Sequence, residues 1–439
     1  IESLEDLCRL IPRNNLDGIL FPNIKVVQQE RDRLIRYCEQ TSLKTLVVPE
    51  MEELRGGNMK RSVREIRIED LLGREEININ LGEIGNLLKG KTVLVTGAAG
   101  SIGSEICRQL AHFQIKRLVC FDSAETPMHN LRLELEEKFK DLNFVPVIGD
   151  VRNPDRVDYV FRNWLPQVVF HAAAYKHVPL MEENPCEAIR TNVFGTRVMA
   201  DAAVAYGVEK FVMISTDKAV NPTNIMGCSK RLAEIYVQSL SIAIGRGEVS
   251  GHTRFITTRF GNVLGSNGSV IPRFRDQIAQ GGPVTVTHPD IIRYFMTIPE
   301  ACRLVLEAGT LGKGGEIFIF DMGEPVKIAD LARRMIESSG LQVNKDIEIK
   351  YTGLRPGEKL YEELLSKKEN TKETPHEKIR VAAVREYAYT DVVEHINLLA
   401  ELSLRVQILP MVKEMKSFVP EFKSQNSKFS ELDIKNQES

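Results

Sequence analysis

The stretch TVLVTGAAGSIGSEICRQL, residues 92–110, decides the fold of this chain. A β-branched run ends at Gly97, and the pattern of an amphipathic helix opens around Gly103. Glycines at 97, 100 and 103 let the backbone turn tightly and approach a pyrophosphate, and the free N–H groups at a helix start favour an anion. The spacing is G-x-x-G-x-x-G, so the strand, loop and helix context is what predicts a dinucleotide-binding loop.

An acidic residue follows the second predicted strand. Asp122 ends RLVCFD, where a carboxylate can accept hydrogen bonds from the adenosine ribose and repels a 2′-phosphate. This position predicts NAD in preference to NADP. Asp150, which follows the third predicted strand, is expected near the adenine. The alternative interpretation is that the glycines only make a tight turn and that Asp122 caps the next helix.

Short apolar strands alternate with helical stretches from residue 91 onward, which predicts an α/β fold with a doubly wound, Rossmann-type parallel sheet. The strands are expected at TVLVTG, RLVCFD, FVPVIGD, QVVFHAAA, FVMIST and FITTRF. We expect part of a small α/β domain at 1–60, a linker at 61–90 and the NAD-binding domain at 91–270. A smaller substrate-binding region at 271–385 and C-terminal helices with a mobile tail at 386–439 complete the prediction.

Composition narrows the class of partner. The chain has 439 residues with 58 basic and 60 acidic side chains, a formal net charge of -2 that gives no basis for binding nucleic acid. Seven dispersed cysteines without a C-x-x-C pair predict neither disulfides nor a metal site. No apolar run reaches the roughly 18 to 20 residues of a membrane helix. We expect a cytoplasmic chain, and its start at Ile1 inside a helical pattern indicates a missing N-terminal segment.

A second stretch, ISTDKAVNPTNIMGCSK at 214–230, carries the chemistry. Thr216, Asp217 and Lys218 follow the strand FVMIST, and Met226 and Lys230 are expected on one face of the next helix. An adjacent acid and base at a strand end can give one proton while removing another. Taken alone, a Thr-Asp pair is also a common helix cap.

These motifs together resemble a known family. TGAAGSIGSE, HAAAYKHVPLMEENP, TNVFGT, STDKAVNPTNIMGCSK, RFGNVLGSNGSVIP and LRPGEKLYEELL resemble the CapD-like group of extended short-chain dehydrogenases/reductases, nucleotide-sugar 4,6-dehydratases acting on UDP-N-acetylglucosamine for polysaccharide biosynthesis. The resemblance covers about residues 60–385, and residues 1–55 resemble a domain of long, membrane-anchored members. It implies the cytoplasmic part of an inner-membrane protein, attached through a missing N-terminal segment, and a homo-oligomer.

The resemblance also implies a mechanism. After transient oxidation of sugar C4 by NAD+, Asp217 serves as the acid at O6 and Lys218 as the base at C5, while Thr216 holds O4. Met226 stands where the superfamily usually has a tyrosine, as it does in some long members, and is expected to be an apolar wall. We expect Thr216 and a water near Lys230 to relay the O4 proton, with Lys230 also holding the nicotinamide ribose.

Binding residues are assigned by the same resemblance. The cofactor set is Gly97, Ala99, Gly100, Ser101, Ile102, Gly103, Asp122, Ser123, Asp150, Val151, Ala172, Ala174, Asn192 and Lys230. The substrate set is Lys176, Asn262, Arg273, Arg293, Arg355 and Glu358. The guanidinium fork of arginine matches the phosphates of a UDP-sugar, although each arginine has a surface ion pair as its alternative role.

Two competing functions remain open at this point. An NAD-dependent nucleotide-sugar epimerase shares the fold and cofactor, but it relies on the tyrosine that Met226 replaces. A noncatalytic NAD-binding regulator would not require a tyrosine at the position of Met226. That function does not explain why Thr216, Asp217 and Lys218 stand together.

Overall fold

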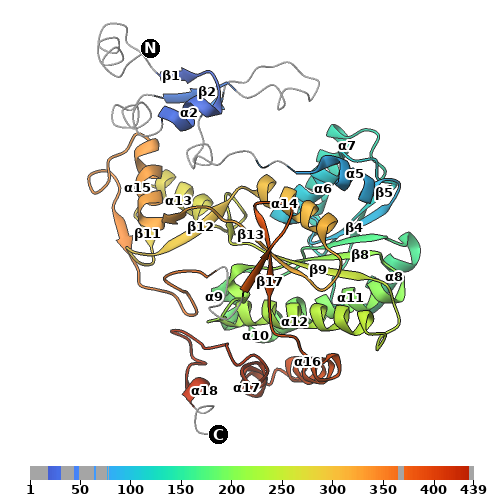
Figure 1. Ribbon diagram of the computed structural model, residues 1–439. Helices are drawn as coiled ribbons and strands as arrows, with labels where there is room; N and C mark the ends of the chain where they lie inside the picture. The colour runs from blue at the N-terminus through green and yellow to red at the C-terminus, as the bar shows by residue number, and fades with distance from the viewer. Residues whose placement is uncertain are drawn as a thin grey trace. The chain divides into compact units, whose positions relative to one another are not determined.

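The computed structural model describes residues 18–30, 44–48, 64–65, 77, 79–363 and 370–434. The chain divides into two compact units (Figure 1). The larger unit holds residues 78–263, 292–325 and 354–439, and the smaller holds residues 1–77, 264–291 and 326–353.

A nine-stranded sheet organises the larger unit, in the order β16-β17-β13-β9-β8-β7-β4-β5-β6. Six of its strands correspond to the six predicted ones and run parallel: β4 Thr92–Thr96, β5 Arg117–Asp122, β6 Phe144–Ile148, β7 Val168–His171, β8 Lys210–Ile214 and β9 Arg254–Arg259. The strand order reverses between β4 and β7, which is where open α/β sheets bind their ligands. The predicted doubly wound fold is therefore confirmed.

Helices cover both faces of this sheet, as a parallel sheet requires. Figure 1 shows α6 and α14 on one face and α11 and α12 on the other, with α8 beside α11. Their bounds are α6 Ser101–Leu110, α8 Pro154–Trp164, α11 Thr196–Ala205, α12 Ile225–Gly245 and α14 Ile298–Leu311. Every residue of α12 from Ile225 to Leu240 is buried, so this helix lies inside the unit.

The predicted substrate-binding region at 271–385 does not stay together as one unit. Its strand β13 Ile317–Phe320 joins the main sheet parallel to β9, β17 Ile379–Ala383 pairs antiparallel with β13, and β16 Asn370–Glu373 pairs with β17. The reason is the apolar run IFIF of β13, all four residues of which are buried in the sheet. The predicted boundary at residue 270 is thus wrong for these strands.

The smaller unit contains short elements. Helix α13 Val270–Ala279 and helix α15 Ile328–Ser338 pack with strand β11 Val284–Val286, which pairs in parallel with β15 Ile349–Tyr351. The described N-terminal elements are β1 Gly18–Phe21, α2 Ile24–Glu30, β2 Lys44–Val47 and β3 Arg64–Glu65. β1 and β2 are parallel, as an α/β domain allows, whereas most of the predicted linker lies outside the described residues.

The end of the predicted linker is helical. Asn80 caps α5 Leu81–Leu88 by accepting a hydrogen bond from the Glu83 backbone N–H at 3.1 Å, and Ile84 and Leu88 are buried. Helix α5 packs against α14 and so belongs to the larger unit. No described helix has the length and apolar character needed to cross a membrane.

The predicted C-terminal helices are present within the larger unit, and described residues after them are packed where a mobile tail was predicted. Helices α16 Tyr389–Leu404 and α17 Ile408–Phe418 pack together, and α16 packs on α12 (Figure 1). After them Phe422 and Phe429 are buried, and Asp433 accepts a hydrogen bond from the buried Lys416 at 2.5 Å. Two isolated aromatic anchors create no periodic pattern, which is why the sequence did not indicate this packing. Helix α16 therefore covers part of α12.

Two helical glycines offer a stability test of the loop. A methyl group on Gly103 would lie 2.0 Å from the Gly97 carbonyl oxygen, whereas one on Gly85 of α5 would have Phe113 as its nearest atom at 3.9 Å. We expect Gly103→Ala to lower the free energy of unfolding by about 1–3 kcal/mol through overpacking. Gly85→Ala should raise it by about 1 kcal/mol through helix propensity. Thermal unfolding of both variants checks this, and equal effects would contradict the close approach.

Candidate active site

The glycine loop joins β4 to α6 at the carboxyl edge of the sheet. Gly97 has a φ of 63°, and a methyl group there would lie 2.7 Å from the backbone of Ala172, which follows β7. Gly100 precedes the first residue of α6, so the helix N-terminus opens onto this loop. The predicted strand, loop and helix are confirmed, and the loop leaves backbone N–H groups of α6 for an anion.

Asp122 is tied to the glycine loop. Its Oδ2 accepts from the backbone N–H of Ala99 at 2.9 Å, and its Oδ1 accepts from the N–H of Ala124 at 2.9 Å. The next helix, α7 Glu125–Lys138, has Ala124 as its N-cap residue and no side-chain cap, so Asp122 does not cap it. Because each carboxylate oxygen has two lone pairs, Asp122 can accept further hydrogen bonds from a ribose.

Asp150 is held by a neighbouring arginine. The Arg152 guanidinium donates to both carboxylate oxygens, with Nη2 to Oδ2 at 2.6 Å, and it also contacts Glu187 Oε2 at 2.6 Å. Burial raises the pKa of Asp150, but the hydrogen bonds from Arg152 outweigh it and the pKa is lowered. Asp150 is thus an ionised group beside the predicted cofactor site.

Asn192 fixes the loop after β7. It is fully buried, and its Oδ1 accepts from the Tyr175 N–H at 2.8 Å while Nδ2 donates to the Tyr175 carbonyl at 3.0 Å and to Ser229 Oγ at 2.9 Å. These contacts hold the loop after β7 in place. The direct cofactor contact that the resemblance implied for Asn192 stays a prediction.

The other predicted cofactor residues lie around the same edge. Ser101 and Ile102 are half-buried in the first turn of α6, and Ala172 and Ala174 are half-buried after β7. Ser123 is exposed after β5, and Val151 is buried after β6. An unpredicted neighbour, His171, contacts Thr96 Oγ1 at 2.7 Å, and burial lowers its pKa to about 3, so it is neutral.

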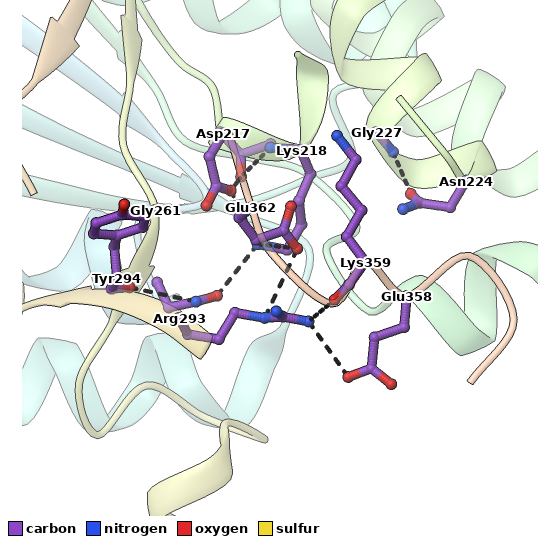
Figure 2. Close-up of polar contacts among 12 residues, drawn as sticks. Asp217, Lys218, Asn224, Gly227, Gly261, Arg293, Tyr294, Glu358, Lys359 and Glu362 are labelled. Atoms are coloured by element: carbon purple, nitrogen blue, oxygen red, sulfur yellow. Dashed lines mark hydrogen bonds and ion pairs between the residues drawn. The ribbon is translucent and has the colours of Figure 1, made fainter. Parts of the chain in front are cut away.

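The predicted acid and base lie side by side (Figure 2). Thr216 caps a 3-10 turn, Asp217–Ala219, that follows β8. Its Oγ1 donates to Asp217 Oδ1 at 2.8 Å, and Lys218 Nζ donates to the same oxygen at 2.9 Å. Asp217 is fully buried, and its Oδ2 has no hydrogen-bond partner. The helix-cap interpretation and the acid-base interpretation thus describe the same turn.

Lys218 is surrounded by oxygen atoms. Its Nζ donates to Asn262 Oδ1 at 3.2 Å and forms an ion pair with Glu362 Oε1 at 3.8 Å. Burial lowers the pKa of Lys218, but the charges of Asp217 and Glu362 outweigh it and the pKa is raised. The amine is therefore protonated in this arrangement.

Helix α12 packs closely against the 3-10 turn Asp217–Ala219. A methyl group on Gly227 would lie 2.2 Å from the Lys218 carbonyl oxygen, and the Asn224 side chain caps the helix by accepting from the Gly227 N–H at 2.7 Å. Met226 and Lys230 both lie on α12, as predicted. Met226 is 3% exposed within the core, and Lys230 Nζ donates to the Ile214 carbonyl at 2.7 Å. Burial lowers the pKa of Lys230 to about 8.

Arg293, on β12 Ile292–Met296, is engaged by protein. Its Nη2 donates to the Lys359 carbonyl at 2.8 Å and its Nη1 to the Leu360 carbonyl at 3.2 Å, while Nη2 lies 3.5 Å from Glu358 Oε1. This guanidinium was predicted to bind a phosphate. Its contacts hold the segment 355–362, and the phosphate contact stays a prediction.

The remaining predicted substrate residues come from several elements. Arg355 is exposed and its backbone N–H donates to Glu358 Oε2 at 3.0 Å. Lys176 is exposed after β7, and Asn262 lies on the short strand β10 Asn262–Val263. Arg273 lies on α13 of the smaller unit, where Nη2 donates to Thr285 at 3.2 Å.

Three of the buried charges that sequence reasoning missed bear on the site. One is Glu362, which stands four residues beyond the predicted Glu358. The others are Glu234 and Arg259, which form a bidentate pair at 2.8 and 2.7 Å, with Ser215 Oγ donating to Glu234 at 2.6 Å. Charged residues inside the apolar patterns KRLAEIY and FITTRF were the available signal.

Comparisons with known proteins place this site in a family context. Residues 93–384 match the family described as "Polysaccharide biosynthesis protein". The chain is 46% identical over 391 residues to the capsular polysaccharide biosynthesis protein CapD of Staphylococcus aureus, with 89% of this chain and 64% of CapD covered. It is 38% identical over 286 residues to a UDP-glucose 4-epimerase of Rickettsia rickettsii, with 64% and 80% covered. The chain thus spans less than two thirds of the length of CapD.

Two solved structures show the same fold. Pen from Bacillus thuringiensis has a TM-score of 0.62 and 38% identity, with 69% of this chain and 91% of Pen covered. A UDP-glucose 4-epimerase of Thermus thermophilus, in complex with NAD, has a TM-score of 0.51 and 25% identity, with 61% and 88% covered.

The buried pair beneath the site yields a stability prediction. Glu234→Gln leaves Arg259 buried without its counter-charge, so we expect a loss of about 3–5 kcal/mol in the free energy of unfolding. Glu248→Gln, at an exposed position, is the control and should change stability by less than about 0.5 kcal/mol. Urea unfolding followed by circular dichroism measures both. If Glu234→Gln has the same free energy of unfolding as the wild type, the Glu234–Arg259 pair does not stabilise the fold beneath the site.

Proposed function

Because the chain belongs to the polysaccharide biosynthesis protein family, we propose that it is an NAD-dependent nucleotide-sugar 4,6-dehydratase acting on UDP-N-acetylglucosamine. One observation carries the proposal: Asp217 and Lys218 form a hydrogen-bonded acid-base pair at 2.9 Å, and the second oxygen of Asp217 is buried without a partner. A dehydratase needs such a pair at C5 and C6, and an unpartnered buried acceptor indicates that a donor from the substrate completes it.

The residues around the glycine loop fit NAD. Gly97 and Gly103 allow the close backbone approaches that a dinucleotide-binding loop uses for its tight turn and for helix packing, and Asp122 stands where it meets the adenosine ribose. Lys230 stands on the α12 side, where it meets the nicotinamide ribose. The structural similarity to an epimerase in complex with NAD supports the same cofactor. NAD, when bound, supplies the hydride acceptor for C4 and the hydride donor for C6.

The contacts of Thr216 support a proton path that needs no tyrosine. Thr216 receives the O4 proton while its own hydroxyl proton passes along the 2.8 Å hydrogen bond to Asp217 Oδ1. Asp217, now a carboxylic acid, gives that proton to O6, which leaves as water. Lys218 releases its ammonium proton to solvent, takes the C5 proton as the neutral amine and later returns it to C5. Asp217 ends as the carboxylate that it was, and Lys218 regains its ammonium proton from solvent, so the protons balance.

This order also couples the two half-reactions. The Asp217 charge favours the ammonium form of Lys218. When the O4 proton reaches Asp217, that charge is neutralised and the pKa of Lys218 falls. Lys218 therefore becomes a competent base only once C4 oxidation has begun.

An epimerase is the second candidate, since the chain is 38% identical to a UDP-glucose 4-epimerase. That reaction moves a hydride from C4 and back to C4, and it uses no acid at O6. The pair of Lys218 with the buried Asp217 favours the dehydratase, and it equally disfavours a noncatalytic NAD-binding regulator.

Product analysis decides among the three functions. The purified protein is incubated with UDP-N-acetylglucosamine in D2O, first without and then with added NAD. We expect a UDP-4-keto-6-deoxy sugar that has lost one water and carries deuterium at C5. An epimer of unchanged mass would instead identify an epimerase. Unreacted substrate would favour the noncatalytic NAD-binding regulator. Lys218→Ala is the control, because it should bind substrate but yield no deuterium at C5.

Substitutions at Thr216 and Met226 test the proton path. Thr216→Val keeps the shape but deletes the hydroxyl, so turnover should fall by about 10² to 10⁴, the usual contribution of general-base assistance. Met226→Leu conserves volume at a buried position and should cost less than about 1.5 kcal/mol of stability with near-normal turnover. Steady-state rates of the two variants are compared. If the Thr216→Val enzyme keeps full turnover, another group, such as Lys230, must accept the O4 proton.

A further inference from the structure

Glu362 is a buried carboxylate that the reaction above does not use. It is 8% exposed, and its Oε1 lies 3.8 Å from Lys218 Nζ and 3.8 Å from Arg293 Nε. Figure 2 shows these contacts converging on one carboxylate. Glu362 therefore joins the predicted base to the arginine that holds the segment 355–362.

The hydrogen bonds of Lys218 leave one N–H of its ammonium group for the carboxylate of Glu362. An ammonium group has three N–H donors, of which Asp217 and Asn262 accept two. Glu362 faces the same amine as a second carboxylate. The positive charges nearby are Arg293 and Lys359, and Lys359 Nζ donates to the Val220 carbonyl at 3.0 Å.

A second observation points to a ligand. Glu362 Oε2 is buried without a hydrogen-bond partner, as is Asp217 Oδ2, so each carboxylate beside Lys218 has one free oxygen in the described structure. A buried acceptor without a donor costs about 1–3 kcal/mol. Hydroxyl groups of a sugar are donors of the right kind for both oxygens.

We propose that Glu362 is a positioning residue of this acid-base pair, whose carboxylate is the counter-charge that, with Asp217 and Asn262, holds Lys218 in place and sets how readily it gives up its proton. The proposal rests on the proposed function only in taking Lys218 as the base at C5. It goes beyond a role in packing, because a packing role does not require the charge of Glu362.

Glu362→Gln tests the charge, because it keeps the shape of the side chain. Lys218 then loses a neighbour that favours its ammonium form, so it titrates at lower pH. An opposite charge at this distance shifts a pKa by about one to three units. We therefore expect the acid limb of kcat/KM against pH to move to lower pH by about one to three units. Glu362→Asp keeps the charge and should leave the limb near its wild-type position.

The neighbouring Glu363 provides a matched control. It is exposed and accepts from Asn221 Nδ2 at 2.7 Å, so Glu363→Gln removes an equal charge one residue away in a screened position. Its rate and pH limb should match the wild type. If Glu362→Gln lowers the rate equally at every pH, or moves the limb upward, the proposal is wrong and Glu362 only supports the loop.

A titration that needs no turnover separates this proposal from the proposed function. Competitive acetylation with acetic anhydride at a series of pH values, followed by peptide mass spectrometry, measures the pKa of Lys218 directly. A lower pKa in Glu362→Gln than in the wild type supports the charge role, and an unchanged pKa overturns it. If the wild-type protein forms no dehydrated sugar, the proposed function fails, and this titration still decides the role of Glu362.

Discussion

The parallel hydrogen bonding of the sheet is the constraint on which the site depends. β4, β7, β8 and β9 run side by side in one direction, so the segments that follow them meet at one edge. The glycine loop, the Asn192-bound loop and the Thr216 turn each follow one of these strands. Glycine allows two of the closest approaches, at Gly97 and at Gly227. Without the shared edge, these groups would be separated by whole helices.

Buried charge forms a second layer under that edge. Glu234 and Arg259 pair within the core, and Ser215, the residue before Thr216, donates to Glu234. Above them Lys218 lies among carboxylates. Charges removed from water are stabilised only when paired and hydrogen-bonded. The lower layer is satisfied in this way, whereas the upper layer retains two unpartnered oxygens, which is the difference expected between a structural and a functional cluster.

The C-terminal segment connects this machinery to the rest of the unit. The Gln425 backbone N–H donates to the Thr223 carbonyl at 3.1 Å, and its carbonyl accepts from the Gly357 N–H at 2.7 Å. Asn224 Nδ2 donates to the Gly357 carbonyl at 2.9 Å. The turn before α12, the segment that carries Glu362 and the C-terminal segment thus share one hydrogen-bond network, so residues far apart in the chain fix the same site.

The sequence by itself determined the features that local pattern encodes. The six parallel strands, the glycine loop, the start of α12 after Asn224 and the adjacency of Asp217 and Lys218 all follow from short spacings, because strand runs, helix caps and tight turns depend on near neighbours. Tertiary structure decided the rest. The tertiary structure places Glu362 beside Lys218 and lets the Arg293 guanidinium donate to backbone carbonyls. It also buries Asn192, and it buries Phe429 where a mobile tail was expected. Each of these depends on burial and on contacts between distant segments, and local spacing carries no information about which distant partner a side chain will meet.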